Sequence, residues 1–206
     1  MVRISDLSAA RLAAFDKHIA LLDSLVPELA PKAGAAFALV AFARQRNVLR
    51  ALTPNRQEQV WLDRVAEIEQ EWWRWCTGES STFPSIAVEA ERVAVAVEPH
   101  LVYPLREVLL NGAALFAALE QGDYAHGKYS AMRNFSVIEL LEEYLPEATV
   151  DQLVFREIER QEQELLLLAD GVDSQTRDKL AAVSSPSEML GEYLTLVPLE
   201  TLPESW

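Results

Sequence analysis

The chain has 206 residues, of which 50% are hydrophobic and 24% are charged, and this balance excludes an intrinsically disordered protein. Its net charge of −14 argues against nucleic-acid binding, which requires a basic surface. The charge is typical of proteins kept soluble by an acidic surface, and the alternative is a surface that binds a basic partner. The first residues carry no signal-peptide pattern, and no apolar run approaches the roughly 20 residues of a membrane span. The single Cys76 cannot form an internal disulfide. We therefore expect a cytoplasmic protein that binds neither nucleic acid nor membranes.

The composition favours helices, because glycine is sparse while alanine and leucine are plentiful. Ser8 is a suitable N-cap for the first predicted helix, and Pro27 ends it. Apolar residues recur in this helix at the spacing of one helical face, and the set comprises Leu12, Phe15, Ile19, Leu22 and either Leu25 or Val26. We expect this face to pack against the rest of the protein.

The second predicted helix, residues 31–52, begins with proline and is apolar on every side as far as Ala43. A helix without a polar face has to be surrounded by other elements. Arg44, Arg46 and Arg50 follow in its second half, where positive charge complements the negative C-terminal end of the helix dipole.

The third predicted helix starts at Thr53-Pro54 and ends near Thr77, before Gly78. Its large apolar side chains follow the helical repeat and should form one buried stripe, made of Trp61, Val65, Ile68, Trp72 and Trp75. Trp73 lies off this stripe. It is a candidate contact for a protein partner, and the alternative is that a neighbouring segment covers it.

Residues 86–97 fit either a strand or a helix, and we predict a helix because no second strand-like run is available for pairing. The segment Leu105–Leu119 contains few polar residues, which predicts the central helix of the fold. Gly112 inside it is costly for a helix, so a close helix crossing is expected there. Gly122 and Asp123 should end this helix and cap the next one, whose apolar positions are Met132, Phe135, Ile138 and Leu141.

The stretch Thr149–Gly171 has the clearest helix boundaries, with a capping-box pattern at Thr149 and Gln152 and a glycine at its end. Gln161 occupies a leucine-like position in its apolar stripe, which otherwise comprises Val154, Ile158, Leu165 and Leu168. Glu157 lies one turn earlier, at the edge of the stripe. A buried amide or carboxylate has to be hydrogen-bonded, so these two residues should contact either a neighbouring helix or a ligand.

Acidic residues are expected over much of the remaining surface of that helix, namely Glu159, Glu162 and Glu164. A short helix near residues 174–183 follows, and a leucine- and proline-rich tail, residues 192–206, should lie extended over the body. The fold predicted from these elements is all-α. Residues 1–191 should form a single compact bundle of about six to eight helices around the central helix Leu105–Leu119.

No pattern in the sequence points to a cofactor or to catalysis. The three histidines are scattered, no second cysteine is available for a metal pair, and no glycine-rich phosphate loop or nucleophile motif occurs. Cys76 lies near the C-terminal end of its helix, where the dipole disfavours a thiolate. The sequence therefore favours a protein without cofactor or metal, and nothing in it favours an enzyme.

Three blocks carry a family resemblance. They are Val102-Tyr103-Pro104 before the apolar helix, Val154-x-x-Glu157-x-x-x-Gln161 before the run LLLLAD, and the sequence AFALVAFARQRN in the second helix. Over about residues 33–191 the chain resembles the YjaG-like family of small, all-helical bacterial proteins of unknown function. It departs from the family pattern in having Ala-Arg-Gln-Arg where Cys-x-Glu-Arg is common. The resemblance implies a compact helical bundle and no established activity, and some relatives of this general class resemble immunity proteins.

Two functional hypotheses follow. The first is a protein-binding module whose acidic surface, including Glu159, Glu162 and Glu164, docks a basic protein such as a toxin, with Trp73 as a further contact. A homodimer is another form of this hypothesis, since the tail and Trp73 would suit an interface. The second is a small-ligand or enzyme-like pocket between helices, with Glu157 and Gln161 as its polar groups. The structural alternative for that pair is a hydrogen bond to a neighbouring helix.

Overall fold

Helix α2 (Pro31–Leu52) is the axis of the fold, because its apolar first half has no polar face to present to water. The computed structural model describes residues 4–52, 56–97, 103–139 and 145–183, and in it residues 33–42 are all buried. Helices α3, α5, α6 and α7 all pack against α2. The expectation that this helix is surrounded is confirmed.

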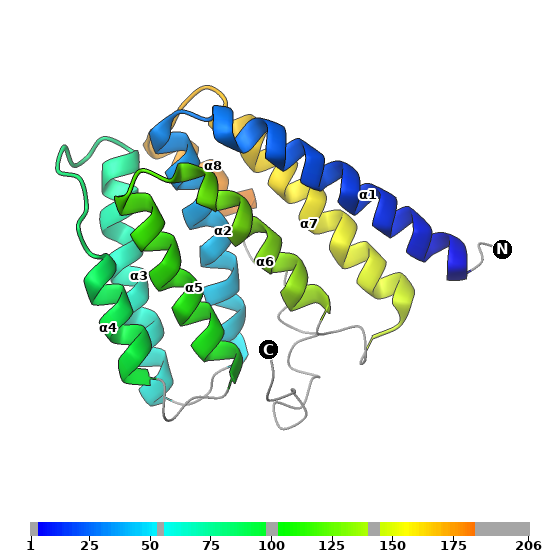
Figure 1. Cartoon of the computed structure of the whole chain (residues 1–206), viewed down its shortest axis with the longest axis horizontal. Coiled ribbons are helices and arrows are strands. Elements are labelled where there is room, and N and C mark those ends of the chain that lie inside the picture. The colour runs from blue at the N-terminus through cyan, green and yellow to red at the C-terminus, as the bar shows by residue number, and fades with distance from the viewer. Residues whose placement is uncertain (1–3, 53–55, 98–102, 140–144, 184–206) are drawn as a thin grey trace.

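The other helices lie on two sides of α2 (Figure 1). On one side α1 (Ile4–Leu25) and α7 (Glu147–Leu168) run side by side, and on the other are α3 (Arg56–Cys76), α4 (Ala87–Val97) and α5 (Tyr103–Glu120). Helix α6 (Gly127–Glu139) packs on α2 between these groups, and α8 (Ser174–Val183) packs on α7. Two short 3-10 turns, η1 (Val26–Glu28) and η2 (Tyr124–His126), complete the described elements. The predicted all-α fold is confirmed.

The centre of the bundle is α2 and not the predicted helix Leu105–Leu119. That segment belongs to α5, in which Leu110 is 37% exposed and Ala114 is also exposed. Helix α5 therefore forms a wall of the bundle. A helix rich in leucine and alanine can tolerate one exposed side, because these residues lose little by partial exposure, so its composition alone did not reveal that side.

Several helix ends differ from the sequence prediction. Helix α1 already starts at Ile4, which places Ser8 inside it, and Leu12 is 61% exposed while His18 is 1% exposed. Helix α7 starts at Glu147 with Pro146 as its N-cap, so the Thr149–Gln152 capping box is not used. The fixed φ of proline suits this boundary, and it outweighs the side-chain signal two residues later.

Other boundaries agree with the sequence. Residues 87–97 form a helix, and the Glu120 carboxylate caps it by accepting hydrogen bonds from the backbone N–H groups of Ile86 and Ala87. Left-handed glycines follow α3, α5 and α7, namely Gly78, Gly122 and Gly171. The side chain of Asp123, by contrast, makes no capping bond. The predictions for Thr53, Leu141 and the tail, and the domain boundary near residue 191, lie outside the described residues.

Gly112 lets α5 approach α2 closely, as the sequence suggested. A β-carbon at this position would lie 2.6 Å from Cζ of Phe42, whose ring is 1% exposed. The Phe42 ring also packs edge-on against Phe116, with 5.8 Å between the ring centroids. The ring therefore has little room to withdraw.

Gly112→Ala should destabilise the protein by about 1–2 kcal/mol, because the overpacking cost exceeds the helix-propensity gain of alanine. Chemical denaturation measures this change in the free energy of unfolding. In the background of Phe42→Leu the same substitution should become neutral or stabilising, because the clash is removed. An equal loss of unfolding free energy in both backgrounds would contradict the close crossing of α5 and α2.

Candidate functional site

A layer of buried polar side chains crosses the bundle where α1, α2, α6 and α7 meet. It consists of His18, Arg44, Glu157, Gln161 and Glu164, each at most 4% exposed. The layer separates two apolar clusters. Along α7, Ile158 belongs to one cluster and Leu165 to the other, and along α1 His18 lies between Phe15 and Leu22 of the two clusters.

Arg44 of α2 is the positive centre of this layer. Its Nη1 donates to Oε1 of Glu164, and its Nη2 lies 2.9 Å from Oε1 of Glu157. Burial by itself would lower the pKa of Arg44, but the charges of the two carboxylates outweigh it and raise the pKa above its ordinary value. Arg44 therefore stays charged inside the bundle. Two carboxylates that lie two turns apart on α7 thus fix the position of α7 against α2.

Gln161 connects three helices. Its Nε2 donates to Oε1 of Glu157 at 2.7 Å and to the backbone carbonyl of Ala131 in α6 at 3.0 Å. Both amide hydrogens are thus used, and its Oε1, which carries no hydrogen, accepts a hydrogen bond from Nε2 of His18 at 2.7 Å. His18 therefore carries a hydrogen on its Nε2. Its Nδ1 is buried without a hydrogen-bond partner and lies 3.8 Å from the carboxylate of Glu162.

Further polar contacts reinforce these helix pairs. Arg160 donates from Nη1 to Glu157 at 3.0 Å and from Nε to the carbonyl of Val183, which ties α7 to the end of α8. Arg11 pairs with the buried Asp151 at 3.4 Å and connects α1 to α7. Between α2 and α6, Gln45 donates to the carbonyl of Ser130 at 2.8 Å, and Asn134 donates to the carbonyl of Ala41 at 3.3 Å.

The predicted pair Glu157 and Gln161 is buried and hydrogen-bonded to neighbouring helices, as the structural alternative required. Glu164 was predicted on the surface, and that prediction is wrong because its side chain is fully buried against Arg44. Glu159 is exposed, and the side chain of Glu162 is 44% exposed. The outer side of α7 also carries Arg156 and Leu166, with Leu166 74% exposed, so it is less acidic than expected.

Trp73 is 5% exposed and is therefore no surface contact, which corrects the sequence prediction. Its Nε1 donates to Oε1 of Glu69 at 3.3 Å, and the guanidinium of Arg177 from α8 lies 5.6 Å from the centre of its ring. Glu69 also accepts from Nε of Arg46 at 3.1 Å. The covering segment that the sequence left open is α8, whose Arg177 also donates to Gln70.

Sequence reasoning missed His18 and Arg44. Arg44 was assigned to the helix dipole, although it lies two turns before the end of α2 and is buried. A signal for the layer was present, because Glu157, Gln161, Glu164 and Leu168 follow a spacing of four, three and four residues, which places them on one helical face. Nothing in the local sequence could show that an arginine 120 residues away lies opposite Glu164.

The described residues offer no conventional metal centre. Among them no group of three or more His, Cys, Asp or Glu side chains could hold a metal ion, and none of the described helices is long and apolar enough to cross a membrane. Burial raises the pKa of Cys76 to about 12, and nearby Lys32 only partly opposes this effect. Cys76 is therefore an unreactive thiol at neutral pH.

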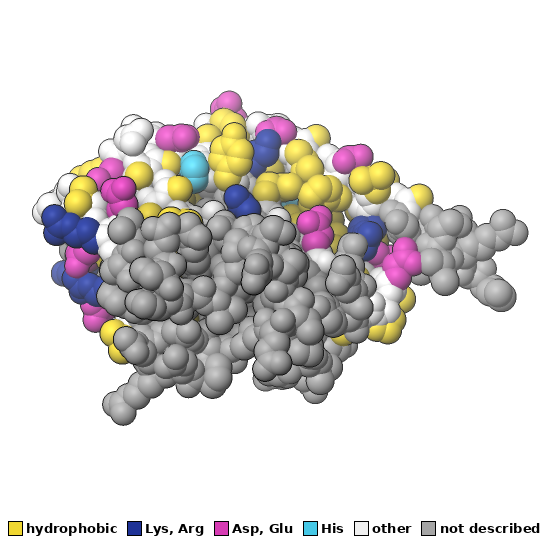
Figure 2. Space-filling view, turned by 60° about the horizontal axis from the view of Figure 1, so that its bottom comes forward, with side chains coloured by type: hydrophobic (Ala, Val, Ile, Leu, Met, Phe, Trp, Pro, Cys, Tyr) yellow, Lys and Arg dark blue, Asp and Glu magenta, His cyan; other side chains and the backbone are white. Residues whose placement is uncertain are grey.

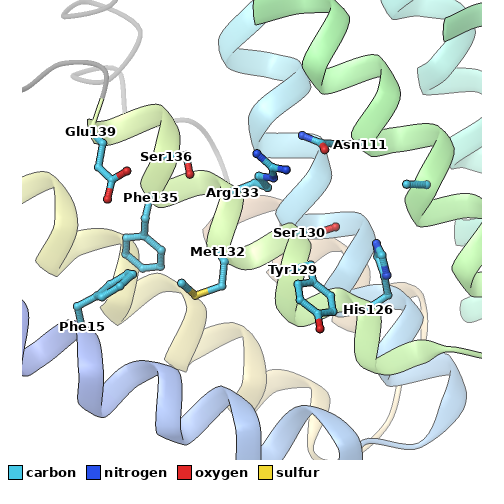
Figure 3. Close-up of a pocket in the computed structure, with 11 residues that line it drawn as sticks. Phe15, Asn111, His126, Tyr129, Ser130, Met132, Arg133, Phe135, Ser136 and Glu139 are labelled. Carbon is cyan, nitrogen blue, oxygen red and sulfur yellow. The ribbon is translucent and has the colours of Figure 1, made fainter. Parts of the chain in front are cut away.

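The polar layer does not line the cavity found beside α6. This cavity, of about 520 Å³, lies along the outer side of α6 between α1 and α5, and neither Glu157 nor Gln161 lines it (Figure 3). Both residues are engaged by protein groups instead. The hypothesis of a ligand pocket around Glu157 and Gln161 is therefore not supported, and the pair is best interpreted as structural.

The fold and the layer define an all-α protein whose helices are joined by buried ion pairs and amide hydrogen bonds. No protein-family model matches the chain, and neither the curated proteins nor the solved structures contain a significant match. The YjaG-like resemblance remains a prediction.

Arg44→Met should destabilise the protein by about 3–5 kcal/mol, because it leaves two buried carboxylates without their counter-charge. Denaturant unfolding measures the loss. Arg50→Met is the matched control, because Arg50 is on the same helix and pairs with Asp63 while both side chains are about half exposed. Its free energy of unfolding should hardly change.

The double variant Arg44→Met/Glu164→Leu should be more stable than Arg44→Met alone. The single variant leaves the buried carboxylate of Glu164 without its counter-charge, and the second substitution removes that carboxylate. If Arg44→Met cost no more than Arg50→Met, the buried layer would not contribute as described.

Cys76 should resist alkylation by iodoacetamide in the native state near pH 8 and react quickly after unfolding. The folded pKa of about 12 leaves almost no thiolate, and the unfolded chain recovers an ordinary thiol. Because the thiolate fraction rises with pH, any native-state rate should increase about tenfold per pH unit below this pKa. Mass spectrometry of time-quenched samples measures both rates, and fast native labelling at pH 8 would contradict the assigned burial.

Proposed function

We propose that this protein is a non-catalytic binding module whose partner is a basic protein. The observation that carries the proposal is the separation of charge between interior and surface. Four arginines, Arg11, Arg44, Arg46 and Arg160, are engaged with four buried acidic residues, Asp151, Glu69, Glu157 and Glu164. The interior networks are therefore balanced, and they account for none of the net charge.

The whole net charge of −14 thus belongs to the rest of the chain. Removing the four arginines and four acids from the 18 basic and 32 acidic residues leaves 14 basic against 28 acidic groups. Several surface cations are already paired, including Arg64 with Glu67 and Glu89, Arg74 with Glu71, and Lys128 with Asp23. On the face seen in Figure 2 the acidic side chains are dispersed among hydrophobic and basic ones. The negative electrostatic field around the protein is therefore a property of the molecule as a whole.

A field of this kind accelerates encounter with a basic partner and disfavours acidic ones. The sharpest form of the proposal is a protein that neutralises a basic toxin in the cytoplasm, as immunity proteins do. Trp73 and Glu164 do not belong to the proposed surface because both are buried.

The proposal predicts that the immobilised protein captures a basic protein from a lysate at low salt and that the association rate falls steeply with salt. Stopped-flow measurement with the purified partner should show this fall between about 0.01 M and about 0.15 M ionic strength, where the Debye length shrinks from ~30 to ~8 Å. Neutralising three exposed carboxylates by Asp16→Asn, Glu159→Gln and Asp178→Asn should slow association severalfold at the lower salt.

The matched control is the double variant Arg50→Gln/Asp63→Asn, which removes an exposed ion pair without changing the net charge. Its association rate should equal that of the natural protein. A partner of acidic character, or an association rate insensitive to both salt and the three neutralising substitutions, would refute the electrostatic proposal.

A further inference from the structure

The cavity along α6 has a two-sided lining that the proposed function does not use. Figure 3 shows Phe15, Met132 and Phe135 on the side of α1, while Asn111 and Arg133 lie toward α5. On the outer side of α6, the cavity is lined by α6 itself, through Tyr129, Ser130 and Ser136. The cavity volume, about 520 Å³, is within the range of small-molecule sites.

The α1 side of this cavity is apolar and has a defined shape. The rings of Phe15 and Phe135 pack edge to face, with 5.0 Å between centroids and an angle of 82°. Met132 is half-buried beside them, and its flexible thioether adapts to irregular apolar groups. This side can accept a hydrocarbon body.

The α5 side provides a positive charge that the protein leaves unused. Arg133 is exposed, and it forms no hydrogen bond or ion pair with any described residue. By contrast, Arg50, Arg64 and Arg74 on other helices all have carboxylate partners. Asn111, half-buried on α5, supplies an amide on the same side.

The remaining charged groups of the cavity indicate where the anionic group of a ligand would lie. Glu139 lies on the α1 side, near Phe135, and as an acidic residue it offers no positive charge to an anionic group. His126 lies 4.0 Å from the carboxylate of Asp123 and next to the ring of Tyr129. Arg133 is thus the group best placed to receive an anion, and its planar guanidinium matches a carboxylate with two parallel hydrogen bonds.

From this arrangement we propose that the cavity binds a small amphipathic carboxylate, with its hydrocarbon body on Phe15, Met132 and Phe135 and its carboxylate on Arg133. The ligand lies across the outer side of α6. Recognition needs both halves of the molecule, because the aromatic side offers no hydrogen-bond donor to a carboxylate and the arginine alone offers little apolar surface to a hydrocarbon tail. The inference is independent of the basic protein partner proposed above.

Isothermal titration calorimetry on the full chain tests this with three probes below their micelle-forming concentrations. Decanoate has both features, decyltrimethylammonium has the same tail with opposite charge, and butyrate has the same head with a short tail. Decanoate should bind at least about tenfold more tightly than either of the others. No binding of decanoate, or equal binding of the cationic probe, would overturn the proposal.

Two pairs of variants locate the site. Arg133→Gln should weaken decanoate binding by about tenfold or more, while Arg92→Gln, which removes an exposed arginine from α4 outside the cavity, should leave it unchanged. Ala114→Trp should block the cavity from α5, whereas Ala20→Trp places the same side chain on an exposed part of α1. If the members of either pair behaved alike, with circular dichroism showing folded protein, the assigned site would be wrong.

Discussion

The guanidinium of Arg44 has to be neutralised inside the protein, and most of the arrangement of α2, α7, α6 and α1 follows from that requirement. An arginine that is 4% exposed is tolerable only beside carboxylates, and Glu157 and Glu164 supply them from one side of α7. Glu157 is then hydrogen-bonded by Gln161, which also binds the backbone of α6 and the ring of His18 in α1. Each of these contacts has a directional requirement that apolar packing lacks. The layer therefore fixes the register of four helices, whereas the two apolar clusters on either side supply most of the favourable burial.

The sequence predicted well which segments form helices, because helical periodicity is a local property. The surrounded first half of α2, the buried stripe of Gln161 and the close crossing at Gly112 were all expected, and each depends on residues within a few turns.

Tertiary partners were harder to predict. Trp73 looked exposed because it lies off the stripe of its own helix, but α8, about 100 residues later, covers it with Arg177. Glu164 was expected on a charged surface because its partner, Arg44, is distant in sequence and no local pattern indicates it. The cavity along α6 was not foreseen, because it is formed by three helices and has no motif of its own.

The two functional proposals draw on separate parts of the molecule. Because the interior charges balance, substitutions on the surface can change the electrostatic field without disturbing the buried layer. The cavity holds an arginine that has no internal partner among the described residues. A protein partner attracted by the overall field and a small carboxylate held beside α6 would therefore respond differently to salt, since the first depends on many distant charges and the second on one contact.

The central claim is that Gln161 is locked into the buried layer, and exchange of its side-chain amide hydrogens with D₂O tests this most directly. Nuclear magnetic resonance can follow these hydrogens individually, with Gln152 and Gln163 on the exposed side of α7 as internal references. Because both amide hydrogens of Gln161 are hydrogen-bonded and its side chain is 0% exposed, they should exchange orders of magnitude more slowly than those of the two references. Exchange of Gln161 at the rate of Gln152 and Gln163 would show that the layer opens freely, and would contradict the account.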